Sequence, residues 1–455
     1  MRLVIGGTQS SVGKTTITLA VAAGAMRKGF RVQSFKVGPD YIDPSYHTLM
    51  TGRTCRNIDT WMVPKKRLIE LIEHASERAD LQLIEGVMGF YDGISGSDDT
   101  GSTAQVSRMT KSPCLLILDV SNMSRSAGAI VKGYTQFDRR VNIAGVILNK
   151  VAGESHTRWC KEAIEGKTGV KVVGAIPIEG GARLRERHLG LIPTAEEHTQ
   201  RAELEDLVAL ILPHLDMDKI LEIASTATPL LIPKNYLFKK KKPAKVKIGV
   251  AIDEAFNFYY QDALDILANR GASIVTFSPV HDSSMPEIDG LYIGGGFPEV
   301  MPKELERNTL MRHNMKKTAE DGTPIYAECG GLMYLTKRIT GFEGKSYKMV
   351  GLLECDTVMT RRLTLNYTLA EVVEKNILMR IGNTIRGHEF HHSKLFSVPH
   401  DAEFAYRMKI GEGIINGLDG WISGNVLASY MHLHFASNLR IADCFISMCE
   451  KNRRL

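Results

Sequence analysis

The chain has 455 residues, more than one ordinary domain holds, so we expect it to be multidomain. Hydrophobic residues make up 44% and charged residues 24%, as in average soluble globular proteins, which disfavours long disorder, collagen-like sequence and a coiled-coil rod. Lysine and arginine number 57 against 51 acidic residues, and this net charge of +6 is weak evidence for nucleic-acid binding and equally suits anionic small molecules.

The cysteines and the lengths of the apolar runs indicate the cellular compartment in which the protein works. Seven cysteines, an odd number spread along the chain, do not form the dense pattern of a small disulfide-bonded domain and favour a reducing cytoplasm. The first residues are strand-like and run into a glycine-rich loop, without the progression of a signal peptide. No apolar run approaches the ~18 residues of a membrane span. We therefore expect a soluble, cytoplasmic protein with no membrane partner.

Short apolar runs alternate with longer helical patterns through the first half of the chain. Val, Ile and Leu follow one another in these runs without strict alternation, which is typical of strands buried on both faces of a parallel sheet. Residues 1–225 are therefore predicted to form an α/β domain with a doubly wound parallel sheet. Its predicted strands are residues 3–6, 32–37, 81–87, 115–120, 143–148 and 172–176.

A change of composition separates this half from the next. Residues 226–246 hold three prolines and four consecutive lysines without periodicity, which predicts a solvated linker. No aromatic residues interleave the lysines, which argues against a nucleic-acid patch. The α/β pattern restarts in residues 247–455, which we predict to be a second α/β domain. Its predicted strands are residues 247–252, 273–277, 291–293 and 325–327.

A glycine-rich loop lies between the first predicted strand and the first predicted helix. Its spacing, Gly-x5-Gly-Lys-Thr, is one residue longer than that of the standard phosphate-binding loop. Backbone N–H groups of such a loop wrap phosphate oxygens, Lys14 adds positive charge, and the Thr15 hydroxyl can ligate Mg²⁺. The residues predicted to hold the nucleotide are Gly7, Thr8, Ser11, Val12, Gly13, Lys14, Thr15 and Thr16.

Acidic residues follow two of the predicted strands. Asp40 and Asp43 lie just past the second strand, and Glu85 and Asp92 lie at the end of the third. Because the carboxyl ends of strands in an open α/β sheet meet at the ligand crevice, we expect all four near the phosphates. The alternative interpretation of each acid is a solvated carboxylate in a loop. This alternative is weakest for Glu85, because an acid at the end of a buried apolar run is costly without a partner.

A cysteine in the second half has the setting of a nucleophile. Cys329 stands in Ala-Glu-Cys-Gly-Gly between a predicted strand and a helix, whose dipole we expect to lower the pKa of the thiol. His432 is the candidate base, and His434 would point the other way in an extended segment. Gly295 and Gly330 are candidate N–H donors to an oxyanion. An inert buried cysteine and structural histidines are the alternatives.

One further motif competes with these. Residues 388–392 match His-Glu-x-x-His, the zinc peptidase pattern, which requires a helix and a further metal ligand. Gly382, Asn383 and Gly387 interrupt the segment upstream, and its β-branched and aromatic residues favour a strand. On a strand the zinc geometry fails, so we expect histidines that are structural or touch substrate.

Together these motifs resemble one family over the whole chain: the cobyrinic acid a,c-diamide synthases and the related enzymes that amidate nickel sirohydrochlorin. The first half resembles an ATP-dependent amidoligase similar to dethiobiotin synthetase, through GTQSSVGKTT, FKVGPDYIDPSYHT, RNIDTWM and IEGVMGFYDG. The second half resembles a class I-type glutamine amidotransferase, through DEAFNFYY, LYIGGGFPE, YAECGGLMYL, RGHEFHHS and ASYMHLHF.

The resemblance implies a two-site ligase of cobalamin biosynthesis. Cys329 would attack the side-chain amide of glutamine, with His432 as proton shuttle, and release glutamate and ammonia. A tetrapyrrole carboxylate would take the γ-phosphate of ATP, and ammonia would displace phosphate from this acyl phosphate at the c and a acetates. The roles implied in the first half are the triphosphate and Mg²⁺ for Lys14 and Thr15, the metal for Asp40 and Glu85, and the substrate or intermediate for Asp43, Asp92, Tyr41 and Tyr46.

Some points stay open after this comparison of motifs. Nickel sirohydrochlorin is the alternative substrate, and a partner-regulating ATPase of the partition or metal-delivery kind is the alternative from another class. Class I amidotransferases carry a glutamate two residues after the catalytic histidine, where this chain has His434, so the orienting partner of His432 is undetermined. The resemblance suggests a homodimer. An enclosed passage for ammonia is also expected, since ammonium, the form that dominates in neutral water, is not a nucleophile.

Overall fold

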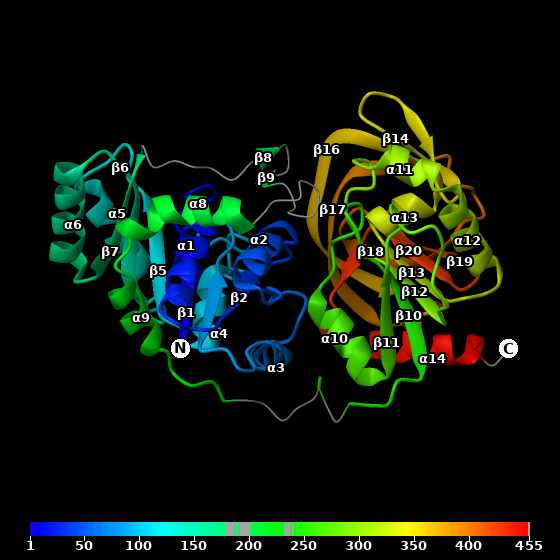
Figure 1. Cartoon of the computed structure of the whole chain (residues 1–455), viewed down its shortest axis with the longest axis horizontal. Coiled ribbons are helices and arrows are strands. Elements are labelled where there is room, and N and C mark those ends of the chain that lie inside the picture. The colour runs from blue at the N-terminus through cyan, green and yellow to red at the C-terminus, as the bar shows by residue number, and fades with distance from the viewer. Residues whose placement is uncertain (179–185, 188–189, 192–200, 232–236, 239–240, 454–455) are drawn as a thin grey trace. The chain divides into compact units, whose positions relative to one another are not determined.

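The computed structural model describes residues 1–178, 186–187, 190–191, 201–231, 237–238 and 241–453. The chain divides into two compact units, Met1–Lys234 and Asn235–Leu455 (Figure 1). The linker predicted at residues 226–246 spans this division, and residues 232–236 and 239–240 within it lie outside the described part. No helix of the described residues combines the length and the hydropathy that crossing a bilayer would need.

The first unit alternates strands with helices. Its strands are β1 (Arg2–Gly7), β2 (Val32–Val37), β3 (Arg56–Ile58), β4 (Leu81–Glu85), β5 (Cys114–Asp119), β6 (Ile143–Val151), β7 (Lys171–Pro177), β8 (Glu186–Arg187) and β9 (Gly190–Leu191). Its helices are α1 (Lys14–Arg27), α2 (Ile42–Thr51), α3 (Lys65–Ala75), α4 (Thr103–Thr110), α5 (Ser126–Phe137), α6 (Glu154–Thr168), α8 (Arg201–Ile211), η2 (Leu212–His214) and α9 (Met217–Ser225).

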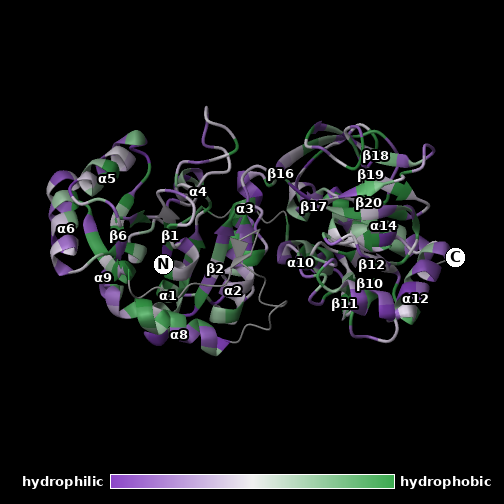
Figure 2. Ribbon diagram, turned by 90° about the horizontal axis from the view of Figure 1, so that it is seen from above, coloured by the Kyte–Doolittle hydropathy of each residue, from purple (hydrophilic) through white to green (hydrophobic). Residues whose placement is uncertain are grey.

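The sheet of this unit is parallel throughout, in the order β3-β2-β4-β1-β5-β6-β7. Figure 2 shows α4 and α5 on one side of it and α1 and α8 on the other. Because both faces are covered, the strands consist of near-continuous apolar residues, and β1 is buried along its whole length. The carboxyl ends of β1, β2 and β4, neighbours in the sheet, therefore bring their following loops together.

The second unit also alternates strands and helices before a strand-rich carboxyl-terminal part. Its strands are β10 (Val246–Ala251), β11 (Ala272–Phe277), β12 (Gly290–Ile293), β13 (Ile325–Glu328), β14 (Thr336–Thr340), β15 (Ser346–Lys348), β16 (Leu353–Val372), β17 (Thr384–Phe396), β18 (Glu403–Ile410), β19 (Leu418–Ser423), β20 (Val426–Ser429) and β21 (His432–Leu433). Its helices are α10 (Gln261–Arg270), α11 (Pro302–Arg307), α12 (Thr309–Glu320), α13 (Gly330–Leu335), η3 (Phe435–Ser437) and α14 (Arg440–Asn452).

The sheet of the second unit is mixed. Strands β11-β10-β12-β13-β20 form a parallel part, and β19, β18 and β16 continue it with antiparallel pairings. Strand β17 pairs with both β16 and β21, which places it over the carboxyl end of the parallel part. The predicted α/β fold of both halves is confirmed. The prediction missed β3, β8 and β9, and from β14 onward it anticipated only β17, because long antiparallel ribbons replace the short apolar runs there.

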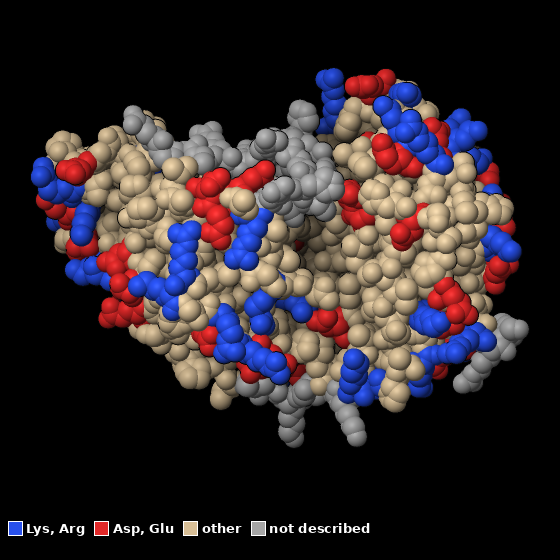
Figure 3. Space-filling model, viewed as in Figure 1, with Lys and Arg blue, Asp and Glu red and all other residues tan. Residues whose placement is uncertain are grey.

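Surface charge is distributed over both units. On the face drawn in Figure 3, lysine and arginine side chains are interspersed with aspartate and glutamate. The net charge of +6 is therefore not gathered into one basic surface on this face.

Candidate functional site

The glycine-rich loop joins β1, which ends at Gly7, to α1, which begins at Lys14. Gly13 has φ 93° and ψ 23°, and a Cβ there would lie 2.7 Å from Nδ2 of Asn149. This Nδ2 also donates a hydrogen bond of 2.9 Å to the carbonyl oxygen of Val12. Glycine is thus required where the loop turns into the helix against β6.

Other side chains fix the loop from outside. The hydroxyl of Tyr134 donates to the carbonyl oxygen of Thr8 at 2.7 Å. The Lys14 ammonium donates to the carbonyl oxygens of Gln9 and Met88 at 3.0 and 2.7 Å, and burial, with the nearby Lys36 charge, lowers its pKa to about 8. The residues predicted to hold the nucleotide all lie in this loop, at its ends or in the first turn of α1: Gly7, Thr8, Ser11, Val12, Gly13, Lys14, Thr15 and Thr16.

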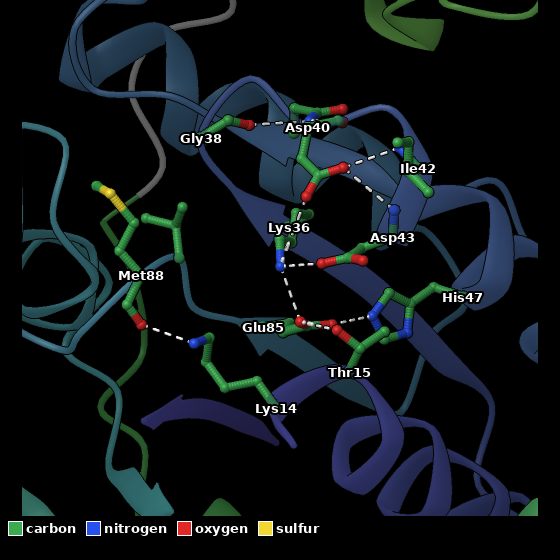
Figure 4. A network of polar contacts seen from close by, with 12 residues as sticks. Lys14, Thr15, Lys36, Gly38, Asp40, Ile42, Asp43, His47, Glu85 and Met88 are labelled. Atoms are coloured by element: carbon green, nitrogen blue, oxygen red, sulfur yellow. Dashed lines mark hydrogen bonds and ion pairs between the residues drawn. The ribbon is translucent and has the colours of Figure 1, made fainter. Parts of the chain in front are cut away.

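A buried lysine joins the acidic residues into one network (Figure 4). Lys36 is 3% exposed on β2, and its ammonium donates to Oε1 of Glu85 at 2.8 Å and forms a close ion pair with Asp43. It lies 3.8 Å from the Asp40 carboxylate. The Thr15 hydroxyl donates to the same Glu85 oxygen at 2.8 Å. The structure thus brings the loop together with three of the four acids named from the sequence: Asp40, Asp43 and Glu85.

Burial and charge oppose each other in this network. Burial alone would raise the pKa of Glu85, but Lys36 and His47, which contacts its second oxygen, hold that pKa below its usual range. Burial would lower the pKa of Lys36, but Asp43, Glu85 and Asp40 raise it. The pKa of Asp43 is raised, first by burial and then by the charge of Asp40. The paired Lys36 and Glu85 are therefore charged at neutral pH.

The oxygen atoms of this cluster suit Mg²⁺. Thr15 and Glu85 place a hydroxyl and a carboxylate side by side at the start of α1, and Asp40 lies across Lys36 from them. Among the residues that the structure describes, no group of three or more His, Cys, Asp or Glu side chains forms a metal cage. The hydroxyl and carboxylate oxygens present are ligand types that Mg²⁺ takes, with water and phosphate oxygens as its usual further ligands.

The remaining predicted residues of this site lie around the cluster. Asp92 is exposed in the loop after β4, where its Oδ2 accepts a hydrogen bond of 2.9 Å from the Gly89 N–H. Its charge acts on Lys14, which places it beside the phosphate loop. Tyr41 is buried at the amino-terminal end of α2, and Tyr46 is buried in the middle of this helix.

The sequence prediction missed Lys36 and His47. Lys36 lies within the predicted strand of residues 32–37, and a charge inside a buried strand requires a partner. The sequence therefore contained a signal that could have identified Lys36 as part of the site. His47 carries no such signal, because its contact with Glu85 depends on how α2 packs beside β4.

The cysteine elbow in the second unit follows β13 and precedes α13. Cys329 has φ 47° and ψ −99°, a strained conformation of the kind found at nucleophile elbows. Its N–H donates to the carbonyl oxygen of Ser429 at 2.7 Å, and its thiol donates to the carbonyl oxygen of Phe390 at 3.4 Å. The side chain is 4% exposed. The predicted strand-turn-helix setting is therefore present.

The prediction of a lowered thiol pKa is wrong. Burial raises the pKa of Cys329, and the charge of Glu299 acts in the same direction. The N–H of Gly330 lowers it, but α13 has only six residues and its effect is smaller than the cost of a buried thiolate. Cys329 is therefore a neutral thiol at rest, and a base would have to take its proton for the sulfur to act as a nucleophile.

His432 has the properties of that base. It begins β21, is fully buried, and pairs in register with His388 of β17, with ring centroids 4.7 Å apart. Burial, and secondly the charge of His391, lowers the pKa of His432 to about 3. Its imidazole is therefore neutral near pH 7, the form with a basic ring nitrogen, although burial makes that nitrogen a weaker base than in an exposed histidine.

A glycine loop touches both the histidine and the elbow. A Cβ added at Gly295 would lie 2.4 Å from Cε1 of His432, so only glycine fits there. A Cβ added at Gly330 would lie 2.9 Å from the carbonyl oxygen of Gly296. Cys329 and His432 thus border the same loop and the same strand, β17. The candidate oxyanion donors are the N–H groups of Gly295 and Gly330, the two glycines that make these contacts.

His434 lies elsewhere in the second unit. Its ring is 4.7 Å from that of Tyr260, and its Nε2 is 3.8 Å from the carboxylate of Asp262. The group beside the catalytic candidate is instead Glu328, whose Oε2 lies 3.9 Å from Nδ1 of His432. The sequence prediction missed Glu328, although it ends a buried strand as Glu85 does.

The residues of the zinc peptidase pattern form strand β17, as predicted, and not a helix. His388 and His391 are buried on this strand. His391 stacks on Tyr430, with ring centroids 3.8 Å apart. His388 and His391 thus pack beside His432 and Tyr430, whereas His392 is half-buried and lies against Phe342.

Comparisons with known proteins agree with the two-domain α/β fold. Residues 3–191 match the family model of the CobQ/CobB/MinD/ParA nucleotide binding domain, and residues 247–439 match that of the CobB/CobQ-like glutamine amidotransferase domain. Cobyrinate a,c-diamide synthase of Methanosarcina barkeri is 44% identical, over 96% of this chain and 95% of that protein. The synthase of the same name from Dehalococcoides mccartyi (strain ATCC BAA-2266) is 46% identical, over 99% of this chain and 98% of that protein. The chain therefore belongs to the cobyrinate a,c-diamide synthase family.

Proposed function

We propose that this chain amidates the a and c acetate carboxylates of cobyrinic acid, with glutamine as the nitrogen donor and ATP as the activating reagent. At the coarser level, the chain is a glutamine-dependent carbon–nitrogen ligase of a tetrapyrrole pathway with a nucleotide-binding domain. The observation that carries the proposal is the presence, in one chain, of a phosphate loop joined to an acidic network and a cysteine elbow bordered by a neutral histidine.

The second unit would release ammonia. His432 takes the proton of the Cys329 thiol as the sulfur attacks the side-chain amide carbon of glutamine. The N–H groups of Gly295 and Gly330 would stabilise the oxyanion. His432 then gives its proton to the departing nitrogen, which leaves as ammonia, and water hydrolyses the thioester to glutamate. The raised thiol pKa supports a concerted proton transfer in place of a resting thiolate.

The first unit would activate the acid. The loop of residues 7–16 holds the triphosphate, with Lys14 against its charge. Mg²⁺, when bound by Thr15, Glu85 and Asp40, would neutralise charge on the phosphates. A substrate carboxylate attacks the γ-phosphorus, and ADP leaves. Ammonia then attacks the carbonyl carbon of the acyl phosphate, and phosphate leaves. Asp43 and Asp92, with Tyr41 and Tyr46, would contact the substrate or this intermediate.

Nickel sirohydrochlorin is the second candidate substrate, because it carries the same kind of acetate side chains. A cytoplasmic location and a homodimer remain part of the proposal. The test supplies the purified full chain with glutamine, MgATP and either cobyrinic acid or nickel sirohydrochlorin. Products are identified by mass spectrometry, since each acid-to-amide conversion changes the mass by a defined amount.

We expect diamide from cobyrinic acid that depends on both glutamine and ATP. If only nickel sirohydrochlorin gave a diamide, it would replace cobyrinic acid as the proposed substrate. If ATP were hydrolysed at the same rate without glutamine and without either tetrapyrrole, and no amide formed, the proposal would be wrong. That outcome would favour a regulatory ATPase.

A further inference from the structure

His432 presents different surroundings at its two ring edges. A Cβ at Gly295 would lie 2.4 Å from its Cε1 and 3.3 Å from its Nε2, so this edge faces the glycine loop. The Nδ1 atom lies 3.9 Å from Oε2 of Glu328. Both side chains are almost fully excluded from solvent. A carboxyl group is therefore close to Nδ1, the ring nitrogen across Cε1 from Nε2.

Glu328 is fixed in this place by groups that do not include the histidine. Its Oε1 accepts a hydrogen bond of 2.8 Å from the Leu433 N–H, in the residue after His432, and another from the hydroxyl of Tyr326. Its Oε2 accepts a hydrogen bond of 2.8 Å from the hydroxyl of Tyr292. The hydroxyl groups of Tyr326 and Tyr292 thus fix the carboxyl group. The carboxyl group in turn accepts the backbone N–H of Leu433 and so fixes β21.

The other titratable groups near His432 are unsuited to orient it. His388 stacks on the ring face, and His391, whose pKa burial lowers to about 4, is neutral near pH 7 and offers no negative charge. Asp419 is a buried acid that accepts the N–H groups of Tyr430 and Met431, just before His432, at 3.0 Å each. Asp419 therefore supports the backbone of this segment, whereas Glu328 supports the backbone and also faces the imidazole.

From this geometry we infer that Glu328, the residue before the nucleophile, is the positioning residue that orients His432 and stabilises its protonated form. The inference rests on the proposed function, in which His432 is the base. A carboxylate at Nδ1 favours the tautomer with the proton on Nδ1, which leaves Nε2 basic. When Nε2 takes the thiol proton, the carboxylate balances the new positive charge. The 3.9 Å separation is long, as catalytic hydrogen bonds often are before substrate binds.

The ionisation of Glu328 gives a readout that a structural role would not share. Burial raises the pKa of Glu328 to about 7, so its carboxylate forms as the pH rises through neutrality. Burial also raises the pKa of Asp419 to about 7, which makes it a matched control. Only the loss of Glu328 should remove a rise in kcat around this pH.

The experiment compares glutamine hydrolysis by the full chain and by four variants: Glu328→Gln, Glu328→Asp, Asp419→Asn and Cys329→Ser. The values of kcat and KM for glutamine are measured as functions of pH, and thermal unfolding is measured for each protein. We expect Glu328→Gln to lower kcat by about 100-fold, with KM changed less than about threefold. Its kcat should no longer rise through pH 7. Glu328→Asp should retain that rise with an intermediate kcat, and this variant carries the test if Glu328→Gln does not fold.

A structural role and a failed assignment give different results. Wild-type kcat and pH dependence in Glu328→Gln, or loss of the rise in kcat in Asp419→Asn as well, would overturn the inference. If Cys329→Ser still hydrolysed glutamine, the proposed function itself would be wrong. Loss of hydrolysis in Cys329→Ser but not in the Glu328 variants would refute only the role of Glu328.

Discussion

Two buried glutamates show how differently the two units use the end of a parallel strand. Glu85 ends β4 and Glu328 ends β13, and they are 0% and 1% exposed. Lys36 and His47 hold the pKa of Glu85 below its usual range, whereas the pKa of Glu328 is raised to about 7. Burial is the same in both places, and only the neighbours differ.

The comparison shows that the charge of the partners decides the protonation of a buried acid. Glu85 is paired with an ammonium, which holds it as an anion beside the phosphate loop. Glu328 accepts hydrogen bonds from tyrosine hydroxyls and a backbone N–H, which offset burial only in part. The first arrangement suits a site for cations and phosphate, and the second suits proton transfer.

The largest expected effect comes from exchanging the two acids for amides. Glu85→Gln should lower ATP-dependent amidation, driven by ammonium salts, by about 1,000-fold, because the phosphate site loses its fixed anion. Glu328→Gln should leave this reaction unchanged. Both rates are measured as diamide formed by the full chain. Equal losses in the two variants would contradict the separate roles of the two acids.

The pairing of Lys36 is expected to dominate the stability of the first unit. Lys36→Met would leave Asp43 and Glu85 without their ammonium, at a cost of about 3 to 5 kcal/mol in the free energy of unfolding. Lys150→Met is the control, since it breaks the partly exposed pair with Asp119 and should cost less than about 1 kcal/mol. Hydrogen exchange of peptides from β2 and β4 measures both. Similar losses of unfolding free energy in the two variants would show that the ion pairs of Lys36 contribute no more than the partly exposed pair of Lys150.

A smaller effect is expected where the glycine loop meets His432. Gly295→Ala should displace the ring, because the new Cβ would lie 2.4 Å from Cε1, and should lower the kcat of glutamine hydrolysis by about 100-fold. Gly341→Ala is the matched control, as its nearest atom lies 3.8 Å away. Ammonium-driven amidation should be unaffected in both. Normal hydrolysis by Gly295→Ala would separate this loop from the reaction.

The smallest expected effect is on the pH dependence of stability. The pKa of Glu328 is raised from 4.5 to about 7, so the folded second unit binds this proton more tightly than the unfolded chain does. Its contribution to stability is present below pH 4.5 and is lost as the pH rises toward 7. Glu328→Gln should flatten part of this fall, measured by hydrogen exchange of β13 and β20 corrected for intrinsic rates. An unchanged slope would contradict the raised pKa.

The sequence predicted the parts of both sites that local patterns determine. Apolar runs located the strands of the parallel sheets, and their ends located the loop with Lys14, the acid Glu85 and the elbow at Cys329. Lys36 was predictable in principle as a charge inside a predicted buried strand. His47 was not, because it meets Glu85 only through the packing of α2.

The second unit shows what local patterns leave out. The helix after Cys329 suggested a lowered thiol pKa, but burial, which depends on the whole fold, raises it. Glu328 stood beside the nucleophile in sequence, yet its relation to His432 arises only because β17 pairs with β21 over the end of β13. The antiparallel strands that make this enclosure lacked the continuous apolar runs that identified the others.

The most direct test of the central claim, a thiol that frees nitrogen in one unit for use in the other, is the variant Cys329→Ser in the full chain. Amidation of cobyrinic acid is measured with glutamine and, separately, with ammonium salts, both with MgATP. We expect glutamine-driven amidation to fall by at least about 1,000-fold and ammonium-driven amidation to remain within about twofold of the wild type. Glutamine-driven amidation at the wild-type rate, or loss of both reactions in a folded variant, would contradict the account.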